Sequence, residues 1–268
     1  MRYQIIGRTD DHASTVVLSA GLGGLGHFWR PQIEALGAHH RVIVYDQRGT
    51  GANAGELPGD YSIAHMADDV VSVLDDAGAA TCHFAGHALG GLVGLELARR
   101  APSRLDSLVL VNAWARVDAH TRRCFDARIG LLNHVGVGAY VRAQPIFLYP
   151  ASWLSAHEEA VRKEEAAGLA HFQGKDNLLK RLSALLAFDA TPDLGRIHTP
   201  TLVAASRDDV LVPFTRSQHL AANLPNASLW LTPEGGHAFT VTDPAPFNAA
   251  LLDFLAKQSR RGPGAKSR

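Results

Sequence analysis

The sequence predicts an α/β fold in which a doubly wound, mostly parallel sheet is interrupted by an inserted helical lid. Short apolar runs alternate with stretches of helical spacing, as strand–helix–strand units do. Residues 15–19 are apolar and rich in β-branched side chains, which indicates a parallel strand buried on both faces. The alternation stops after residue 113 and resumes near residue 196, and the residues between show only helical patterns.

Residues 1–113 form the first part of the predicted core. Strands are expected at 2–6, 15–19, 41–45, 82–85 and 105–111. Three helices are expected in this part. One begins within 27–33, one covers 63–77, and one follows the turn at 86–91 and ends before Pro102.

The predicted lid covers residues 114–195, with helices at 122–132, 138–144, 157–172 and 177–188. The second part of the core covers 196–258, with strands at 201–205 and 227–231 and helices at 214–224 and 244–257. The remaining residues, 259–268, are basic and rich in glycine and serine, so a disordered tail is expected there.

The composition narrows the choice of partners and compartment. Lys+Arg and Asp+Glu both number 26, so no basic field favours a nucleic acid. No apolar stretch reaches the length of a membrane span, and the N-terminus lacks the apolar core of a signal peptide. The two cysteines, Cys82 and Cys124, form neither a disulfide framework nor a zinc spacing. We therefore expect a cytoplasmic protein with no cofactor and no metal.

The segment Gly86-His87-Ala88-Leu89-Gly90-Gly91 joins an apolar run to a helical one. Glycines at the first and fifth positions are typical of the nucleophile elbow G-x-S-x-G, a strained turn between a strand and a helix. The middle position, where the nucleophile stands, is Ala88. The sequence therefore predicts chemistry that proceeds without a covalent serine intermediate.

Two later loops complete the pattern of a hydrolase triad. An acidic loop at 206–213 follows one predicted strand, and Gly235-Gly236-His237-Ala238 follows the last one. Elbow, acid and histidine in this chain order are typical of α/β hydrolases. We favour Asp209 over Asp208 as the acid, because it stands four residues before Pro213. The glycine-rich loop at 20–26 lacks G-K-[ST], so it is either a plain turn or an oxyanion loop.

Three stretches of the predicted lid, at 119–125, 143–150 and 169–179, resemble the RutD family together with the segments GHALGG and GGHA. This family of α/β-hydrolase-like proteins belongs to the Rut pathway of pyrimidine utilisation, and its members resemble this chain in having alanine at the elbow. The resemblance implies an aminohydrolase in uracil breakdown. Carbamate and 3-aminoacrylate both stay open as the substrate.

The elbow and the two later loops also suggest roles for individual residues. A water beside Ala88 would lose a proton to His237, which Asp209 orients, and the backbone N–H groups of Leu22 and Leu89 would hold the oxyanion. Both substrates are small anions and need a cation. The cations of the predicted lid are Arg122, Arg123, Arg128, Lys175 and Arg181. We prefer Arg123 and Lys175, which lie within the family-specific stretches, and we expect His83 and His87 to be structural.

Two other functions remain open on the sequence. The missing nucleophile is also compatible with a non-catalytic protein that binds or scavenges a ligand on a hydrolase scaffold. A serine esterase would need Ser19, Ser62 or Ser206, none of which stands at the elbow. Composition does not separate lid surfaces from subunit interfaces, so a monomer and a homodimer are both compatible with the sequence.

Overall fold

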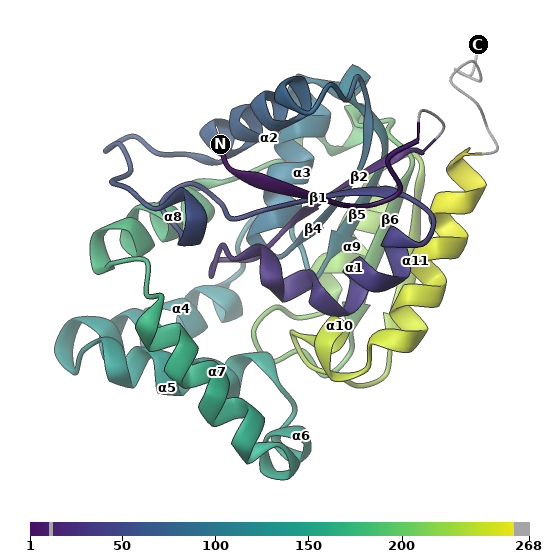
Figure 1. The fold of residues 1–268 in the computed structure, drawn as a ribbon. Coiled ribbons are helices and arrows are strands. Elements are labelled where there is room, and N and C mark those ends of the chain that lie inside the picture. Colours follow the sequence, from purple (N-terminus) through teal and green to yellow (C-terminus); the bar gives the residue numbers. More distant parts are fainter. Residues whose placement is uncertain (11–12, 260–268) are drawn as a thin grey trace.

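A computed structural model describes residues 1–10 and 13–259 of the chain. Its strands form one seven-stranded sheet in the order β1-β3-β2-β4-β5-β6-β7 (Figure 1). β1 pairs antiparallel with β3, and every other pairing is parallel. The predicted mostly parallel sheet is confirmed. The strands are β1 (Tyr3–Gly7), β2 (Thr15–Ser19), β3 (Arg41–Tyr45), β4 (Cys82–His87), β5 (Leu105–Val111), β6 (Thr201–Ser206) and β7 (Ala227–Thr232).

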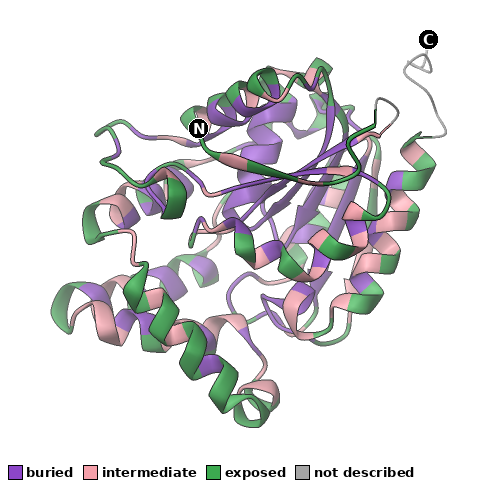
Figure 2. Ribbon diagram, viewed as in Figure 1, coloured by how far each residue is buried: buried purple, intermediate pink, exposed green. Residues whose placement is uncertain are grey.

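Helices cover both faces of this sheet, as a doubly wound fold requires. The core helices are α1 (Arg30–Gly37), α2 (Ile63–Asp76), α3 (Leu89–Arg100), α9 (Thr215–Asn223), α10 (Phe239–Thr242) and α11 (Pro244–Ser259). Side chains alternate along each strand, so Val17 packs with the α2 and α3 side while Val16 and Leu18 pack with α1 and α11. Figure 2 shows the central strands almost entirely buried, and this places the core on both faces of the sheet.

Five helices connect β5 to β6, and no strand of the sheet comes from residues 112–200, all of which are described. They are α4 (Ala119–His134), α5 (Val137–Leu148), α6 (Ala151–Ala156), α7 (Glu158–Ala170) and α8 (Lys175–Ala187). We call α4–α8 the insertion. In Figure 1, α4 to α7 lie together to one side of the sheet. The start of α4 is fixed by Asp118, whose carboxylate accepts a 2.8 Å hydrogen bond from the Thr121 N–H.

The C-terminal end differs slightly from the prediction. Helix α11 continues to Ser259, so the predicted tail starts one residue too early. The rest of that tail, 260–268, lies outside the described residues. Among the helices of the described residues, none has both the length and the apolar character needed to cross a membrane.

His40 is a buried histidine of the core that is kept neutral. Its Nδ1 is hydrogen-bonded to the Ser14 hydroxyl at 2.8 Å. Burial lowers the pKa of His40 from 6.5 to about 4, and the neighbouring His83 lowers it further in the same direction. The unfolded chain therefore binds a proton at His40 before the folded chain does. The stability contribution is present above pH 6.5 and is lost as the pH falls toward 4.

We expect the His40→Gln variant to lose less stability on acidification than the wild type, because glutamine does not titrate. The difference between pH 7.5 and pH 5 is about 2 kcal/mol for a pKa lowered this far. Urea unfolding at the two pH values measures it. His219→Gln, which changes an exposed histidine of α9, serves as the control. If the free energy of unfolding has the same pH dependence in wild type and His40→Gln, the lowered pKa of His40 is contradicted.

Candidate active site

The turn between β4 and α3 has the backbone of a nucleophile elbow. Ala88, at its apex, has φ 48° and ψ −110°, a conformation that costs a non-glycine residue about 1–3 kcal/mol. A Cβ on Gly86 would collide with the Gly90 carbonyl, and one on Gly90 would collide with the carbonyl of Ser19. The glycines are therefore required by the close approach of backbone segments. The chain keeps the strained elbow with a methyl group where a nucleophile would stand.

His237 and Asp209 form a buried pair beside this elbow. The His237 Nδ1–H donates to Asp209 Oδ2 at 2.7 Å. The other carboxylate oxygen, Oδ1, accepts from the N–H groups of Leu211 (2.8 Å) and Val212 (2.9 Å). With its proton on Nδ1, a neutral His237 carries a free lone pair on Nε2. Among the described residues no group bonds Nε2, and His237 and Ala88 both line the same cavity.

Asp208, the neighbouring acid, has a different place. Its carboxylate accepts from the N–H groups of Gly235 (3.2 Å) and Gly236 (2.8 Å), and from the Ser206 hydroxyl. Asp208 therefore fixes the glycine turn that precedes His237. The carboxylate hydrogen-bonded to the His237 ring is that of Asp209, the residue favoured on the sequence.

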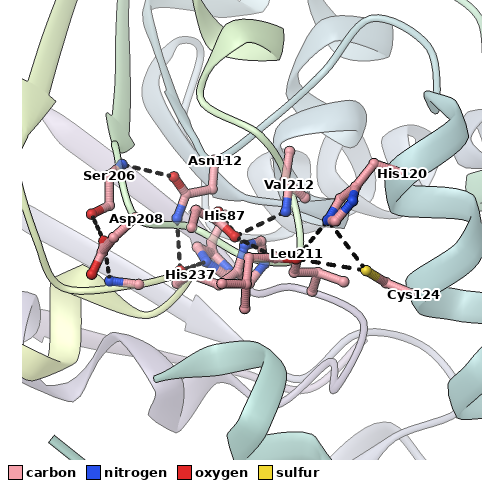
Figure 3. A network of polar contacts seen from close by, with 12 residues as sticks. His87, Asn112, His120, Cys124, Ser206, Asp208, Leu211, Val212 and His237 are labelled. Carbon is pink, nitrogen blue, oxygen red and sulfur yellow. Dashed lines mark hydrogen bonds and ion pairs between the residues drawn. The ribbon is translucent and has the colours of Figure 1, made fainter. Parts of the chain in front are cut away.

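Two side chains that the sequence did not assign to the site hold the backbone of His237 (Figure 3). Asn112 Nδ2 donates to the His237 carbonyl at 2.7 Å, and His87 Nε2–H donates to the same oxygen at 2.9 Å. Asn112 has φ 48°, the second such non-glycine residue in the described chain. Its position directly after β5, at the carboxyl edge of the sheet, is the signal that marks it.

His87 has a structural role, as expected, but it lies at the cavity. His87 lines the cavity, and its ring centroid lies 4.6 Å from that of His237. Burial holds the pKa of His87 well below its usual value, and the nearby His237 acts in the same direction. His87 is therefore neutral, with its proton on Nε2, where it supports the His237 loop. His83, which bonds the Ser107 hydroxyl at 2.8 Å, is buried elsewhere, as expected.

The cavity has a volume of about 550 Å³ and lies between the carboxyl edge of the sheet and the insertion. Leu22 and Leu89 both line it. The N–H of Leu89 belongs to the first turn of α3 and has no carbonyl of its own helix to bond. The cavity walls are largely apolar, from Leu22, Leu25, Phe28, Trp114, Phe125, Val141, Leu148, Phe172 and Leu211. The predicted oxyanion residues thus share one cavity with Ala88 and His237.

The structure corrects the choice of substrate-binding cations. Arg123 is exposed on α4 and donates to the carbonyl of Ala119, and Lys175 is exposed at the start of α8. Neither lines the cavity, whereas Arg128 does. The helical period explains this, because Arg128 shares the buried face of α4 with Thr121, Cys124, Phe125 and Leu132, and Arg123 lies on the other face. Hydrophobic spacing within α4 was the signal that identifies Arg128.

None of the serines weighed as a nucleophile reaches the cavity. Ser19 is hydrogen-bonded to the Tyr45 hydroxyl, Ser206 to Asp208, and Ser62 to His65. In the part of the chain that the structure describes, the cavity lining contains no serine. Within the same residues, no group of three or more His, Cys, Asp or Glu is placed to hold a metal ion.

Comparison with known proteins agrees with this architecture. A family model of the alpha/beta hydrolase fold matches residues 14–133. A protein of Agrobacterium fabrum named "Putative carbamate hydrolase RutD" is 52% identical over 255 residues, 95% of this chain and 98% of that protein. One of the same name from Variovorax paradoxus is 54% identical over 263 residues, 98% of each chain. The crystal structure of the enol-lactonase from Burkholderia xenovorans LB400 superposes with a TM-score of 0.86 at 26% identity, covering 95% of this chain and 96% of that one. The chain is therefore an α/β hydrolase and belongs to the RutD family.

Proposed function

We propose that this hydrolase releases ammonia from carbamate or 3-aminoacrylate in uracil breakdown, using water activated by His237 in place of a serine nucleophile. The observation that carries the proposal is the complete His237–Asp209 pair beside Ala88. A hydrolase that had lost its serine and all activity would not need a strained elbow or an oriented imidazole, and this chain has both. The name of the relatives, carbamate hydrolase, supports the first of the two substrates.

The mechanism for carbamate uses the groups in the cavity. A water molecule occupies the space beside the Ala88 methyl group and gives a proton to His237 Nε2 as its oxygen bonds to the carbamate carbon. The N–H groups of Leu22 and Leu89 stabilise the negative charge on oxygen. The C–N bond then breaks, and His237 returns the proton to the departing nitrogen. The products are ammonia and bicarbonate, which equilibrates with carbon dioxide.

The same groups act on 3-aminoacrylate through its imine tautomer. Water adds to the carbon that bears nitrogen, with His237 again accepting the proton. His237 passes that proton to the imine nitrogen, which gives a neutral carbinolamine. His237 then transfers the hydroxyl proton of the carbinolamine to the nitrogen as the C–N bond breaks, which releases ammonia and leaves malonic semialdehyde. In both reactions His237 acts first as a base and then as an acid, and Asp209 keeps its ring in one orientation.

The second candidate function is that of a non-catalytic binding protein. The observation in its favour is the alanine at the elbow, in a cavity larger than either substrate requires. A water molecule takes about 30 Å³ of liquid volume, and each substrate has only a few heavy atoms. A binding protein would sequester the substrate and slow its spontaneous decay, whereas an enzyme would accelerate it.

Ammonia release at increasing protein concentration distinguishes the two functions. We expect the initial rate with carbamate or 3-aminoacrylate to rise in proportion to protein and to exceed the rate in buffer alone. The measurement follows ammonia continuously at a fixed substrate concentration, while the protein is raised from a small fraction of that concentration to an equal one. A rate that stays at the buffer value rejects the hydrolase, and a rate that falls as protein approaches the substrate concentration supports the binding protein.

A further inference from the structure

Arg128 is a buried cation that lacks a carboxylate partner. The residue is only 5% exposed and lies on the inner face of α4. Among the described residues, no Asp or Glu oxygen lies within 4.0 Å of its guanidinium. Buried charges in proteins are almost always paired, because an unpaired one loses its hydration without compensation. Arg128 is therefore costly to the free protein unless something else satisfies it.

The surroundings of Arg128 hold its guanidinium in place but use only part of its donors. Nη2 donates to the Tyr140 hydroxyl at 3.3 Å and to Gln144 Oε1. The guanidinium carbon lies 5.2 Å from the ring centroid of Phe125 and 5.6 Å from those of Tyr140 and Phe147. Nε is buried without any partner, and no described residue accepts from Nη1. The group is thus oriented by aromatic rings. Nη1 is the donor left for a ligand, because Nε is buried and both hydrogens of Nη2 are used.

The charges around the cavity select the kind of anion. Besides Arg128, the charged residues of the lining are Lys163, Glu164 and Glu165. The ammonium of Lys163 forms a 2.7 Å ion pair with Glu159, which does not line the cavity. Two carboxylates in the lining disfavour a dianion such as phosphate. A monoanion matches the single charge and the one free donor, Nη1, of this guanidinium, and a carboxylate is such an anion.

We propose that Arg128, with Tyr140 and Gln144, is the subsite that binds the carboxylate of the substrate and makes the protein selective for monocarboxylates over neutral amides. The inference deepens the proposed function and rests on it for the identity of the cavity as the reaction site. Arg128 and its partners belong to α4 and α5, whereas His237 and Asp209 follow β7 and β6. The insertion thus supplies substrate selection, and the edge of the sheet supplies the reacting groups.

The test compares propanoate with propanamide, which share their shape and differ in charge. We expect the wild type to bind propanoate at least about tenfold more tightly, since hydrogen bonds to a charged group exceed those to a neutral one. Arg128→Met is expected to abolish this preference. Arg128→Lys, which keeps the charge and loses the planar guanidinium, is expected to keep part of it. Arg123→Met, an exposed arginine of the same helix, is the matched control and is expected to keep all of it.

Ligand-observed NMR titrations of each protein measure these affinities without any catalysis. Thermal unfolding verifies that each variant is folded. If Arg128→Met does not fold, Arg128→Lys tests the subsite in its place. Equal affinity of the wild type for both ligands, or an unchanged preference in folded Arg128→Met, overturns the proposal. Where substrate is hydrolysed, Arg128→Met is also expected to raise KM by about tenfold or more with a smaller change in kcat. Binding of propanoate that depends on Arg128 in a protein without hydrolysis rejects the proposed function and leaves the subsite standing.

Discussion

Replacing His237 with alanine is expected to lower the catalysed rate of ammonia release by about 10²–10⁴-fold, the usual contribution of a positioned general base. Among the described residues, His237 is the one whose ring is held by a buried carboxylate while Nε2 stays free at the cavity. His87 cannot replace it, because its Nε2–H is bound to the His237 carbonyl and its charged form is disfavoured by burial.

The fold of His237→Ala should survive, because the anchors of this loop are backbone contacts. Asn112 and His87 bond the carbonyl of residue 237, and Asp209 keeps its two bonds from Leu211 and Val212. The measurement is kcat/KM for ammonia release after the uncatalysed rate is subtracted, with circular dichroism to verify the fold. His219→Ala, an exposed histidine of α9, should retain full activity. Equal rates in wild type and His237→Ala would reject His237 as the base.

The sheet could be predicted almost completely from local sequence, because its strands are encoded in their own residues. The β-branched run at β2 and the period of α2 each fix an element without reference to the rest of the chain. The elbow was equally visible, since its glycines follow from close backbone contacts inside one turn. The order of the three loops along the chain then places Ala88, Asp209 and His237 at one edge of the sheet.

What the sequence did not yield depends on contacts between distant segments. The bond from Asn112 to His237 spans 125 residues and that from His87 spans 150, and no local pattern encodes either. Arg128 is a different case. Likeness to the family stretches favoured Arg123, but the burial of one face of α4 decides which arginine reaches the cavity. Helical periodicity is the stronger guide here because packing, and not motif membership, determines where a side chain points.

Restoring a hydroxyl at the elbow, by Ala88→Ser, is expected to turn the protein into a serine hydrolase. The apex already has φ 48°, so serine meets no new backbone strain beyond that which alanine bears. Its Oγ would enter the cavity near His237, whose Nε2 can accept the proton, with Leu22 and Leu89 available for the oxyanion. We expect covalent labelling by a fluorophosphonate probe, and a rise of at least about 10²-fold in hydrolysis of an activated acetate ester.

The wild type is the first control and should remain unlabelled, because Ser19, Ser62 and Ser206 lie outside the cavity lining. The double variant Ala88→Ser/His237→Ala is the second control, and it should lose the labelling because the hydroxyl then has no base. A folded Ala88→Ser variant that stays unlabelled would show that the elbow and His237 are not aligned for nucleophilic attack. Ammonia release should fall in the single variant, since the new Oγ occupies the place of the attacking water. A rise in ester hydrolysis together with a fall in ammonia release would mean that the side chain at residue 88 determines whether His237 activates water or a serine hydroxyl.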